Sequence, residues 1–201
     1  MQMKSKAKLL FILIASMLLT ITSAFSQSGQ STNKTYSLGK LKPTDSQLKV
    51  KSGDLAPDFT LPSVSGKKIT LSQYREKKNV VLSFVPAAWT PICSEQWPGY
   101  TMVKETLDEN DTVLLGITVD NIPTLHAWTQ HIGPLWFEVL SDFWPHGAIA
   151  DKYGVLRSDG LSERALFFID EKGIIRAIVV MDINKKPDVK VCFRDIDKLS
   201  K

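Results

Sequence analysis

The chain has 201 residues, an apolar share of 43% and a charged share of 23%. These values fit one ordinary globular domain with short appendages, and they exclude a collagen-like chain, a polytopic membrane protein and a wholly disordered protein. The formal net charge of +4 falls to about +1 without the three lysines of residues 1–26 (4 minus 3), so the basicity typical of a nucleic-acid-binding protein is missing and no nucleic-acid partner is expected.

Residues 1–26 have the pattern of a secretory signal peptide. Three lysines precede an apolar run over residues 9–21, and small residues follow it up to an expected cleavage site near Gln27. An uncleaved membrane anchor is the alternative, but the apolar run is shorter than the roughly 20 residues that a spanning helix needs. We therefore expect an exported protein, either periplasmic or secreted.

Residues 27–50 are rich in Ser, Thr, Gln and Lys and contain few large apolar side chains, which predicts a flexible linker. The folded domain is therefore expected over residues 51–201. Its first elements are two short extended pieces, residues 58–61 and 68–71, joined by a turn that contains Gly66. This pattern predicts an N-terminal β-hairpin.

Two dense β-branched runs, residues 79–85 and 112–119, predict strands that are buried on both faces. The segment between them, residues 93–110, has the length and polarity of a helix, with a kink predicted at Pro98. Together the three segments form a βαβ unit.

The next helix has sequence signals at both ends. Asp120 or Asn121 can cap it, Pro123 lies in its first turn, and Gly133 with Pro134 ends it. The elements expected after it are a strand over residues 136–140, a short helix over 147–153, a hairpin of residues 165–169 and 174–181, and a final helix over 188–199. The chain is therefore predicted to be an α/β domain in which helices cover a central mixed sheet.

Cys93 is the most informative residue, because it follows a buried strand and is expected at the start of a helix. The unpaired N–H groups and the positive dipole end of a helix start stabilise a thiolate relative to a thiol. A lone Cys is more often a small apolar core residue. However, strand-to-helix turns lie at the edge of α/β sheets, where ligands bind.

A dithiol oxidoreductase would have a second Cys three residues before Cys93, and this chain has Thr90 there. Disulfide exchange within one motif is therefore excluded. A hydroxyl beside a thiolate can instead donate a hydrogen bond to a substrate oxygen. Capping of the helix is a second role of Thr90 that is compatible with this one.

Pro86, Thr90 and Cys93 stand in the order P-x-x-x-T-x-x-C, which resembles the active-site motif of the peroxiredoxins. The resemblance extends over about residues 53–182 and is also carried by residues 56–61, 115–119, 141–148, 153–155 and 164–170. Of these stretches, residues 141–148 are most similar to the one-Cys alkyl hydroperoxide reductase E subgroup.

The resemblance implies a thioredoxin-like fold and a thiol-dependent peroxidase that reduces hydrogen peroxide or organic hydroperoxides through a Cys93 sulfenic acid, with no metal and no organic cofactor. It assigns hydrogen bonds to the peroxide oxygens to Thr90 and Arg164, and shielding of the sulfur from water to Pro86. The implied partners are the peroxide, an external thiol or thioredoxin-like reductant, and a second copy in a homodimer. The alternative is a thioredoxin-like thiol-carrier or binding domain without peroxidase activity.

Two positions leave details of the site open. Many peroxiredoxins have Glu three residues after the reactive Cys, where this chain has Gln96. Cys192 is the only other thiol, and its position on the apolar side of the final helix favours a structural role, although an oxidising compartment permits a disulfide between Cys93 and Cys192. The three histidines do not form a tight set of ligands, so no metal site is expected.

Overall fold

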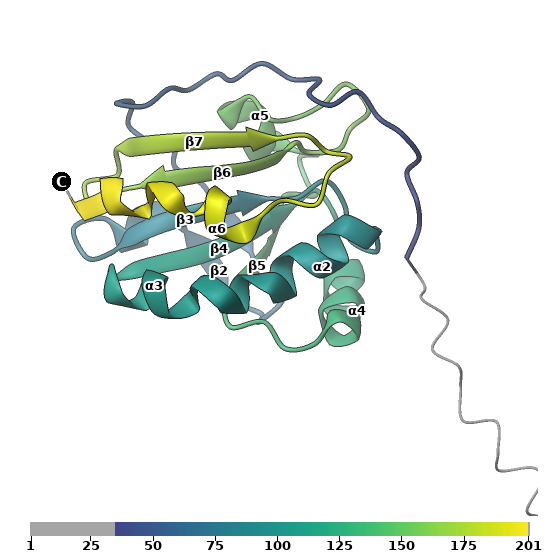
Figure 1. Ribbon diagram of the computed structural model, residues 1–201, viewed down its shortest axis with the longest axis horizontal. Helices are drawn as coiled ribbons and strands as arrows, with labels where there is room; N and C mark the ends of the chain where they lie inside the picture. The colour runs from purple at the N-terminus through teal and green to yellow at the C-terminus, as the bar shows by residue number, and fades with distance from the viewer. Residues whose placement is uncertain (1–34, 201) are drawn as a thin grey trace, which may run out of the picture. The chain divides into compact units, whose positions relative to one another are not determined.

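A five-stranded mixed sheet lies at the centre of the computed structural model, which describes residues 35–200 (Figure 1). The strand order is β5-β4-β3-β6-β7. The neighbours β3 and β4 pair in parallel, as do β4 and β5, whereas β6 is antiparallel to both β3 and β7. The strands are β3 (Asn79–Phe84), β4 (Thr112–Thr118), β5 (Glu138–Ser141), β6 (Arg164–Ile169) and β7 (Ile175–Met181). The expected signal peptide and residues 27–34 lie outside the described residues.

The side chains of the central strands alternate between the two sides of the sheet, and both sides are buried. On one face, Leu82 and Phe167 belong to an apolar core that also contains Tyr153. On the other face, Val81 belongs to a second core that contains Trp97. The β-branched runs of the sequence are therefore the strands between two layers, as predicted.

Helices cover both faces of the sheet, and a separate hairpin packs with them. Figure 1 shows α2, α3 and α6 on one side of the sheet, with α4 beside α2. The hairpin strands, helices and 3-10 segments outside the central sheet are β1 (Thr60–Pro62), β2 (Lys68–Thr70), η1 (Leu71–Tyr74), α2 (Pro91–Gly99), η2 (Tyr100–Val103), α3 (Lys104–Glu109), α4 (Ile122–Ile132), α5 (Ala148–Tyr153), α6 (Val189–Cys192) and η3 (Arg194–Ser200). The expected N-terminal hairpin is present, since β1 and β2 pair antiparallel.

Two expected helices differ from their predictions. Where a kink was expected at Pro98, the helix changes type: α2 ends at Gly99, the 3-10 segment η2 follows it, and α3 begins after η2. The continuous helix expected over residues 188–199 is wrong: α6 ends at Cys192 and the 3-10 segment η3 follows. This segment contains β-branched and Asp residues of weak helix propensity, so the burial of Phe193 and Ile196 decides its path.

The structure also differs from the predicted linker over residues 35–50, which we call the N-terminal strap. Figure 1 shows the strap in dark blue, running past the start of α2 and beside β7. Its backbone bonds to the domain, since the N–H groups of Asp45 and Ser46 donate to Glu163 Oε1 at 2.6 and 3.0 Å. Composition predicted a linker because the strap is polar, but its hydrogen-bond acceptors belong to residues far away in the sequence.

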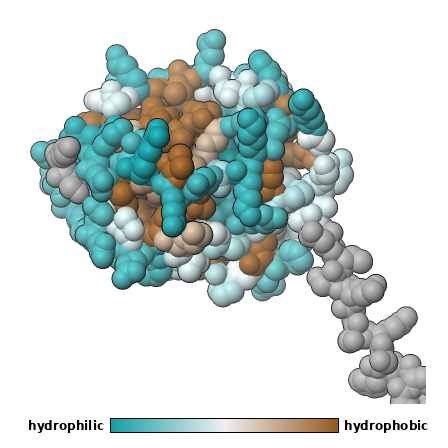
Figure 2. Space-filling model, in the orientation of Figure 1, coloured by the Kyte–Doolittle hydropathy of each residue, from teal (hydrophilic) through white to brown (hydrophobic). Residues whose placement is uncertain are grey.

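The face of the molecule that carries α6 is mainly polar. Figure 2 shows hydrophilic side chains around apolar ones on this face. Val191 is 54% exposed and Met102 is 65% exposed.

None of the helices within residues 35–200 has the length and apolarity needed to cross a membrane.

Candidate active site

Cys93 lies in the first turn of α2, just beyond the loop that leaves β3. Thr90 is the N-cap residue, Pro91 begins the helix, and Ser94 N–H donates to the Thr90 carbonyl at 3.0 Å. The N–H groups of Ile92 and Cys93 precede this first intrahelical bond, so they have no acceptor within the helix. The positive end of the helix therefore lies beside the Cys93 sulfur.

The loop between β3 and α2 is held by β4. The N–H of Ala88 donates to Asp120 Oδ2 at 2.8 Å, and the same carboxylate oxygen accepts a bond from the Thr118 hydroxyl. Trp89 in this loop has a φ of 61°, in the left-handed region that only a well-held backbone sustains. The loop therefore presents Thr90 and Cys93 in a fixed arrangement.

Arg164 brings a positive charge to the sulfur. It begins β6, and the register that pairs Ala165 with Phe84 sets Arg164 beside the end of β3. Its Nη1 and Nη2 atoms each lie 3.6 Å from Cys93 Sγ, and the residue is 1% exposed. A guanidinium at this distance in a buried site stabilises a thiolate.

Gln96 connects Arg164 to a buried hydroxyl network. Its Oε1 accepts a bond from Arg164 Nη1, and its Nε2 donates to the Tyr100 hydroxyl at 2.5 Å. The Tyr100 hydroxyl lies 3.1 Å from Ser83 Oγ. Burial raises the pKa of Tyr100 to about 12, so the phenol stays neutral at ordinary pH. Gln96 therefore orients Arg164 without neutralising its charge.

Arg164 differs from Arg157 and Arg176, two other arginines of the domain. Arg157 pairs with the buried carboxylate of Glu163 at 2.9 Å, and Arg176 pairs with Asp170 at 2.5 Å. Within residues 35–200, no carboxylate forms an ion pair with Arg164, and its Nε atom is buried without a hydrogen-bond partner. Among these residues, no carboxylate therefore neutralises the charge of Arg164, and its Nε donor is unused.

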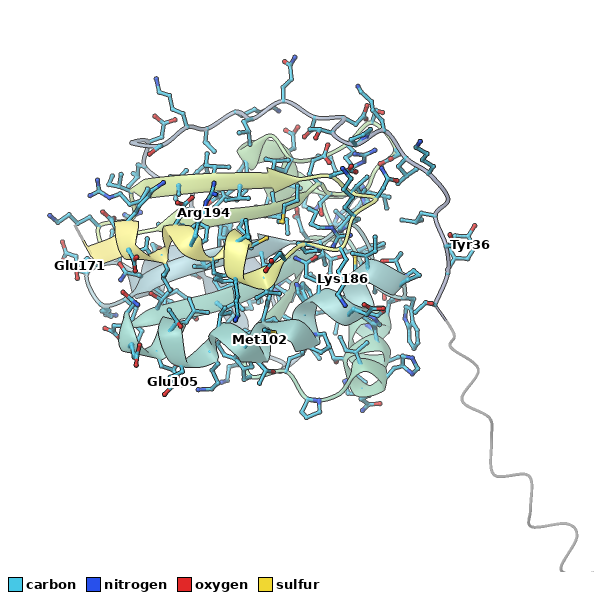
Figure 3. The ribbon with its side chains drawn as sticks, in the orientation of Figure 1. Tyr36, Met102, Glu105, Glu171, Lys186 and Arg194 are labelled. Atoms are coloured by element: carbon cyan, nitrogen blue, oxygen red, sulfur yellow. The ribbon has the colours of Figure 1, made fainter. Side chains whose placement is uncertain are left out.

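A pocket of about 410 Å³ opens at this site. Pro86, Thr90 and Arg164 line it, whereas Cys93 lies behind this lining with no exposed surface. The Thr90 hydroxyl donates to the Ala87 carbonyl at 2.9 Å. The remaining lining residues are Ser37, Leu38, Gly39, Lys40, Leu41, Pro91, Ile92, Ile183 and Asn184. Figure 3 marks this end of the molecule by Tyr36 on the strap and Lys186 in the loop after β7.

The family model described as AhpC/TSA family matches residues 52–178, which include Pro86, Thr90, Cys93 and Arg164. The chain belongs to the AhpC/TSA family.

Two curated relatives and one solved structure are similar to this AhpC/TSA protein. It is 40% identical over 125 residues to alkyl hydroperoxide reductase E of Mycobacterium bovis, covering 62% of this chain and 81% of the relative. It is 36% identical over 141 residues to peroxiredoxin-2 of Mus musculus, covering 65% and 70%. The crystal structure of reduced 2-Cys peroxiredoxin from Plasmodium vivax has a TM-score of 0.69 and 29% identity, covering 74% of this chain and 81% of that chain. The predicted family and the thioredoxin-like α/β fold are therefore confirmed.

The structure brings together the four residues that the sequence singled out, and their catalytic roles stay predictions. Cys93 contacts Arg164, while Pro86 and Thr90 share the pocket with Arg164. Sequence reasoning missed the pocket residues of the strap, together with Ile183 and Asn184. No local pattern marks these residues, because only the folded chain sets them beside Thr90.

Cys192 is not arranged as a reactive thiol in this AhpC/TSA protein. It is 5% exposed, and its S–H donates to Met181 Sδ at 3.2 Å. Burial, followed by the nearby charge of Asp188, raises the pKa of the Cys192 thiol. A thiol that stays protonated is a poor nucleophile, which favours the structural interpretation of Cys192.

The histidines have separate surroundings. His131 stacks on Trp89 with 5.1 Å between ring centroids, His126 bonds to Gln130, and His146 bonds to the Gly160 carbonyl. In the described part of the chain, no three His, Cys, Asp or Glu side chains converge as metal ligands.

Proposed function

We propose that this protein is a thiol-dependent peroxidase that reduces hydroperoxides through a sulfenic acid at Cys93. The observation that carries the proposal is the distance of 3.6 Å from Cys93 Sγ to both Nη atoms of an arginine that has no acidic partner among the described residues. Family membership and the names of the relatives, alkyl hydroperoxide reductase E and peroxiredoxin-2, support the same activity.

The first chemical step uses groups that the site already holds. The Cys93 thiolate attacks the terminal oxygen of ROOH, the S–O bond forms as the O–O bond breaks, and the departing RO⁻ takes a proton from water to become ROH. Negative charge grows on the departing oxygen. The guanidinium of Arg164 and the N–H groups at the start of α2 stabilise that charge.

Two further donors can bind the peroxide oxygens. Arg164 Nε is a buried N–H without a partner among residues 35–200, and a buried donor in this state gains by bonding to a ligand oxygen. The Thr90 hydroxyl donates to the Ala87 carbonyl, and rotation about its C–O bond turns the same proton toward the pocket. Pro86, beside them in the pocket wall, restricts the access of water to the sulfur.

The second half of the cycle uses an external reductant. One RSH attacks the sulfenic acid to give a mixed disulfide and water, and a second thiol releases Cys93 and forms a disulfide. Cys192 is unsuited to this attack because it is buried and protonated. We therefore expect a small thiol or a thioredoxin-like protein to supply the electrons.

Turnover with dithiothreitol tests the function. Wild-type protein should consume hydrogen peroxide and cumene hydroperoxide, Cys93→Ser should consume neither, and Cys192→Ser should retain most of the activity. Loss of activity in Cys192→Ser would instead assign a resolving role to Cys192. Consumption by the wild type no faster than by the same concentration of free thiol would favour the thiol-carrier or binding domain.

The assembly and destination of the protein belong to the same proposal. Membership of the AhpC/TSA family supports the proposal that the protein is a homodimer. Light scattering after size-exclusion chromatography should then give twice the mass of one chain. The pattern of residues 1–26 supports export to the periplasm or the medium. N-terminal sequencing of the mature protein should begin near Gln27, and an intact Met1 on the exported protein would favour the membrane anchor.

A further inference from the structure

The pocket above Cys93 has two walls of different origin. Pro86, Thr90 and Arg164 form the inner wall, and all three lie within the residues that match the family model. The outer wall consists of residues 37–41 of the strap with Ile183 and Asn184, and these lie outside the match at residues 52–178. The outer wall therefore lies outside the segment that the family model matches.

The strap residues of the outer wall are held on both sides. Asn184 Oδ1 accepts a bond from the N–H of Leu41 at 2.9 Å, and Asn184 Nδ2 donates to the Leu41 carbonyl at 2.9 Å. Asp182 Oδ1 accepts bonds from both the backbone N–H and the Nδ2 of Asn184 at 3.0 Å, which sets the orientation of the amide. At the other end, Tyr36 N–H donates to the Trp89 carbonyl at 2.6 Å.

The rest of the strap is anchored next to Arg164. Glu163, the preceding residue, has no exposed surface and accepts the bonds from Asp45 and Ser46 N–H while it pairs with Arg157. The Ser158 hydroxyl and N–H in turn bond to the Asp45 carboxylate at 2.5 and 2.9 Å. A wall held in this way keeps its shape when a ligand enters, which reduces the entropy lost on binding.

The size and chemistry of the pocket indicate what it binds. Hydrogen peroxide has two heavy atoms, whereas about 410 Å³ lies in the usual range of sites for small organic ligands. Leu38, Leu41, Ile92 and Ile183 give this space an apolar lining, which it shares with the donors Thr90 and Arg164. A ligand that carries a hydroperoxy group on an apolar body therefore fits this lining.

We propose that Leu38 and Leu41 of the strap, together with Ile183, form a specificity wall that holds the apolar body of an organic hydroperoxide while its O–O group reaches Cys93. This inference rests on the proposed peroxidase activity and adds the residues that choose among peroxides. The strap thereby raises the reactivity toward bulky apolar hydroperoxides relative to hydrogen peroxide.

The test is the ratio of second-order rate constants for cumene hydroperoxide and hydrogen peroxide, measured with full-length protein. In the Leu38→Ser/Leu41→Ser variant this ratio should fall at least about tenfold, the usual effect of losing apolar contacts in a binding pocket. Leu48→Ser is the matched control, because Leu48 belongs to the same strap, is 45% exposed and does not line the pocket. It should keep the wild-type ratio.

Asn184→Ala provides a second variant, since it removes both bonds to Leu41 without touching an apolar side chain. It should lower the same ratio and speed amide hydrogen exchange at Leu41. An unchanged ratio in both variants would overturn the specificity wall. This holds both when the two rate constants keep their wild-type values and when they fall by the same factor. Failure of the wild type to consume any peroxide would instead overturn the proposed function.

Discussion

Thr90 occupies the N-cap position that the sequence suggested for it, but its side chain does not cap the helix. It is the N-cap residue of α2, but its hydroxyl bonds to the Ala87 carbonyl and not to a helix N–H. The cap is therefore made by backbone geometry, and the hydroxyl proton reaches a substrate oxygen only by leaving the Ala87 carbonyl. This arrangement separates the effect of the hydroxyl on the reaction from its effect on folding.

Thr90→Val tests that separation. Loss of the hydroxyl should slow the reaction of Cys93 with hydrogen peroxide by about a hundredfold, as the loss of one donor to a developing oxyanion commonly does. Circular dichroism should change little because the hydroxyl does not cap α2, and the unfolding free energy should fall only by the cost of the lost bond to the Ala87 carbonyl, about 1 kcal/mol. Thr90→Ser keeps the hydroxyl and should keep most of the rate. Equal slowing in Thr90→Ser and Thr90→Val would contradict the donor role.

Tyr100 gives the protein a pH-dependent stability on the alkaline side. Its pKa is raised by burial from 10.0 to about 12, so the folded state holds a proton that the unfolded state has lost in this interval. The contribution to stability is complete below pH 10 and is lost as the pH rises through about 12. The unfolding free energy should therefore decrease by up to about 1.4 kcal/mol per pH unit for this group.

Urea unfolding at pH 9, 10 and 11 checks this expectation against Tyr100→Phe. The variant should lose less stability per pH unit than the wild type. It should not become flat, because burial also raises the pKa of Tyr153. Identical slopes for the two proteins would show that Tyr100 ionises equally easily in the folded and unfolded states.

The site residues that lie close together in the sequence were predictable. Those that only the fold brings together were less predictable. Pro86, Thr90 and Cys93 form one motif, so their spacing alone indicates a common site. Arg164 came from a resemblance, since nothing local separates it from Arg157. The sequence marked Gln96 only as a departure from the family pattern, because its bonds to Arg164 and Tyr100 depend on how α2 packs on β6.

Among the elements, those with strong local signals matched the sequence prediction. The predicted end signals of α4 are present, since Asn121 accepts a bond from Thr124 N–H and Gly133 follows the helix with a φ of 96°. The final helix was not predictable, because its apolar spacing fits both an α-helix and the observed succession of α6 and η3. Periodicity shows which side chains are buried, whereas caps and breakers decide where an element ends.

The end of α5 is shaped by the strap that crosses it. Gly154 follows α5 with a φ of 74°, and a Cβ there would lie 2.2 Å from Lys49 N and 2.3 Å from Gln47 O. Gly66 has a φ of 82° with no atom within 4 Å of such a Cβ. The two glycines share the left-handed conformation and differ in the close approach of the strap.

Gly154→Ala should therefore destabilise the protein more than Gly66→Ala. The left-handed conformation alone costs about 1–2 kcal/mol for a residue with a Cβ, and the clash with strap backbone adds to it at Gly154. Urea unfolding of both variants measures the difference. Equal losses of stability would mean that the strap moves away from α5 at no cost.

At the scale of the whole molecule, the domain combines a buried reaction centre with a cover made by its N-terminal residues. The βαβ order predicted the sheet and set Cys93 at its edge, as the structure has it. The strap was not predictable, because a polar segment with few apolar residues has the composition of a linker. Its attachment depends on Glu163, Asn184 and Trp89, which are distant in the sequence.

We expect Arg164 and the start of α2 to activate Cys93 for attack on a peroxide. The most direct test is a single-turnover reaction of the reduced protein with one equivalent of hydrogen peroxide, quenched with dimedone and read by mass spectrometry of the Cys93 and Cys192 peptides. We predict one dimedone adduct, at Cys93, formed at least about a hundredfold faster than on free cysteine. Adduct formation at the rate of free cysteine, or first at Cys192, would show that Arg164 and the start of α2 do not activate Cys93.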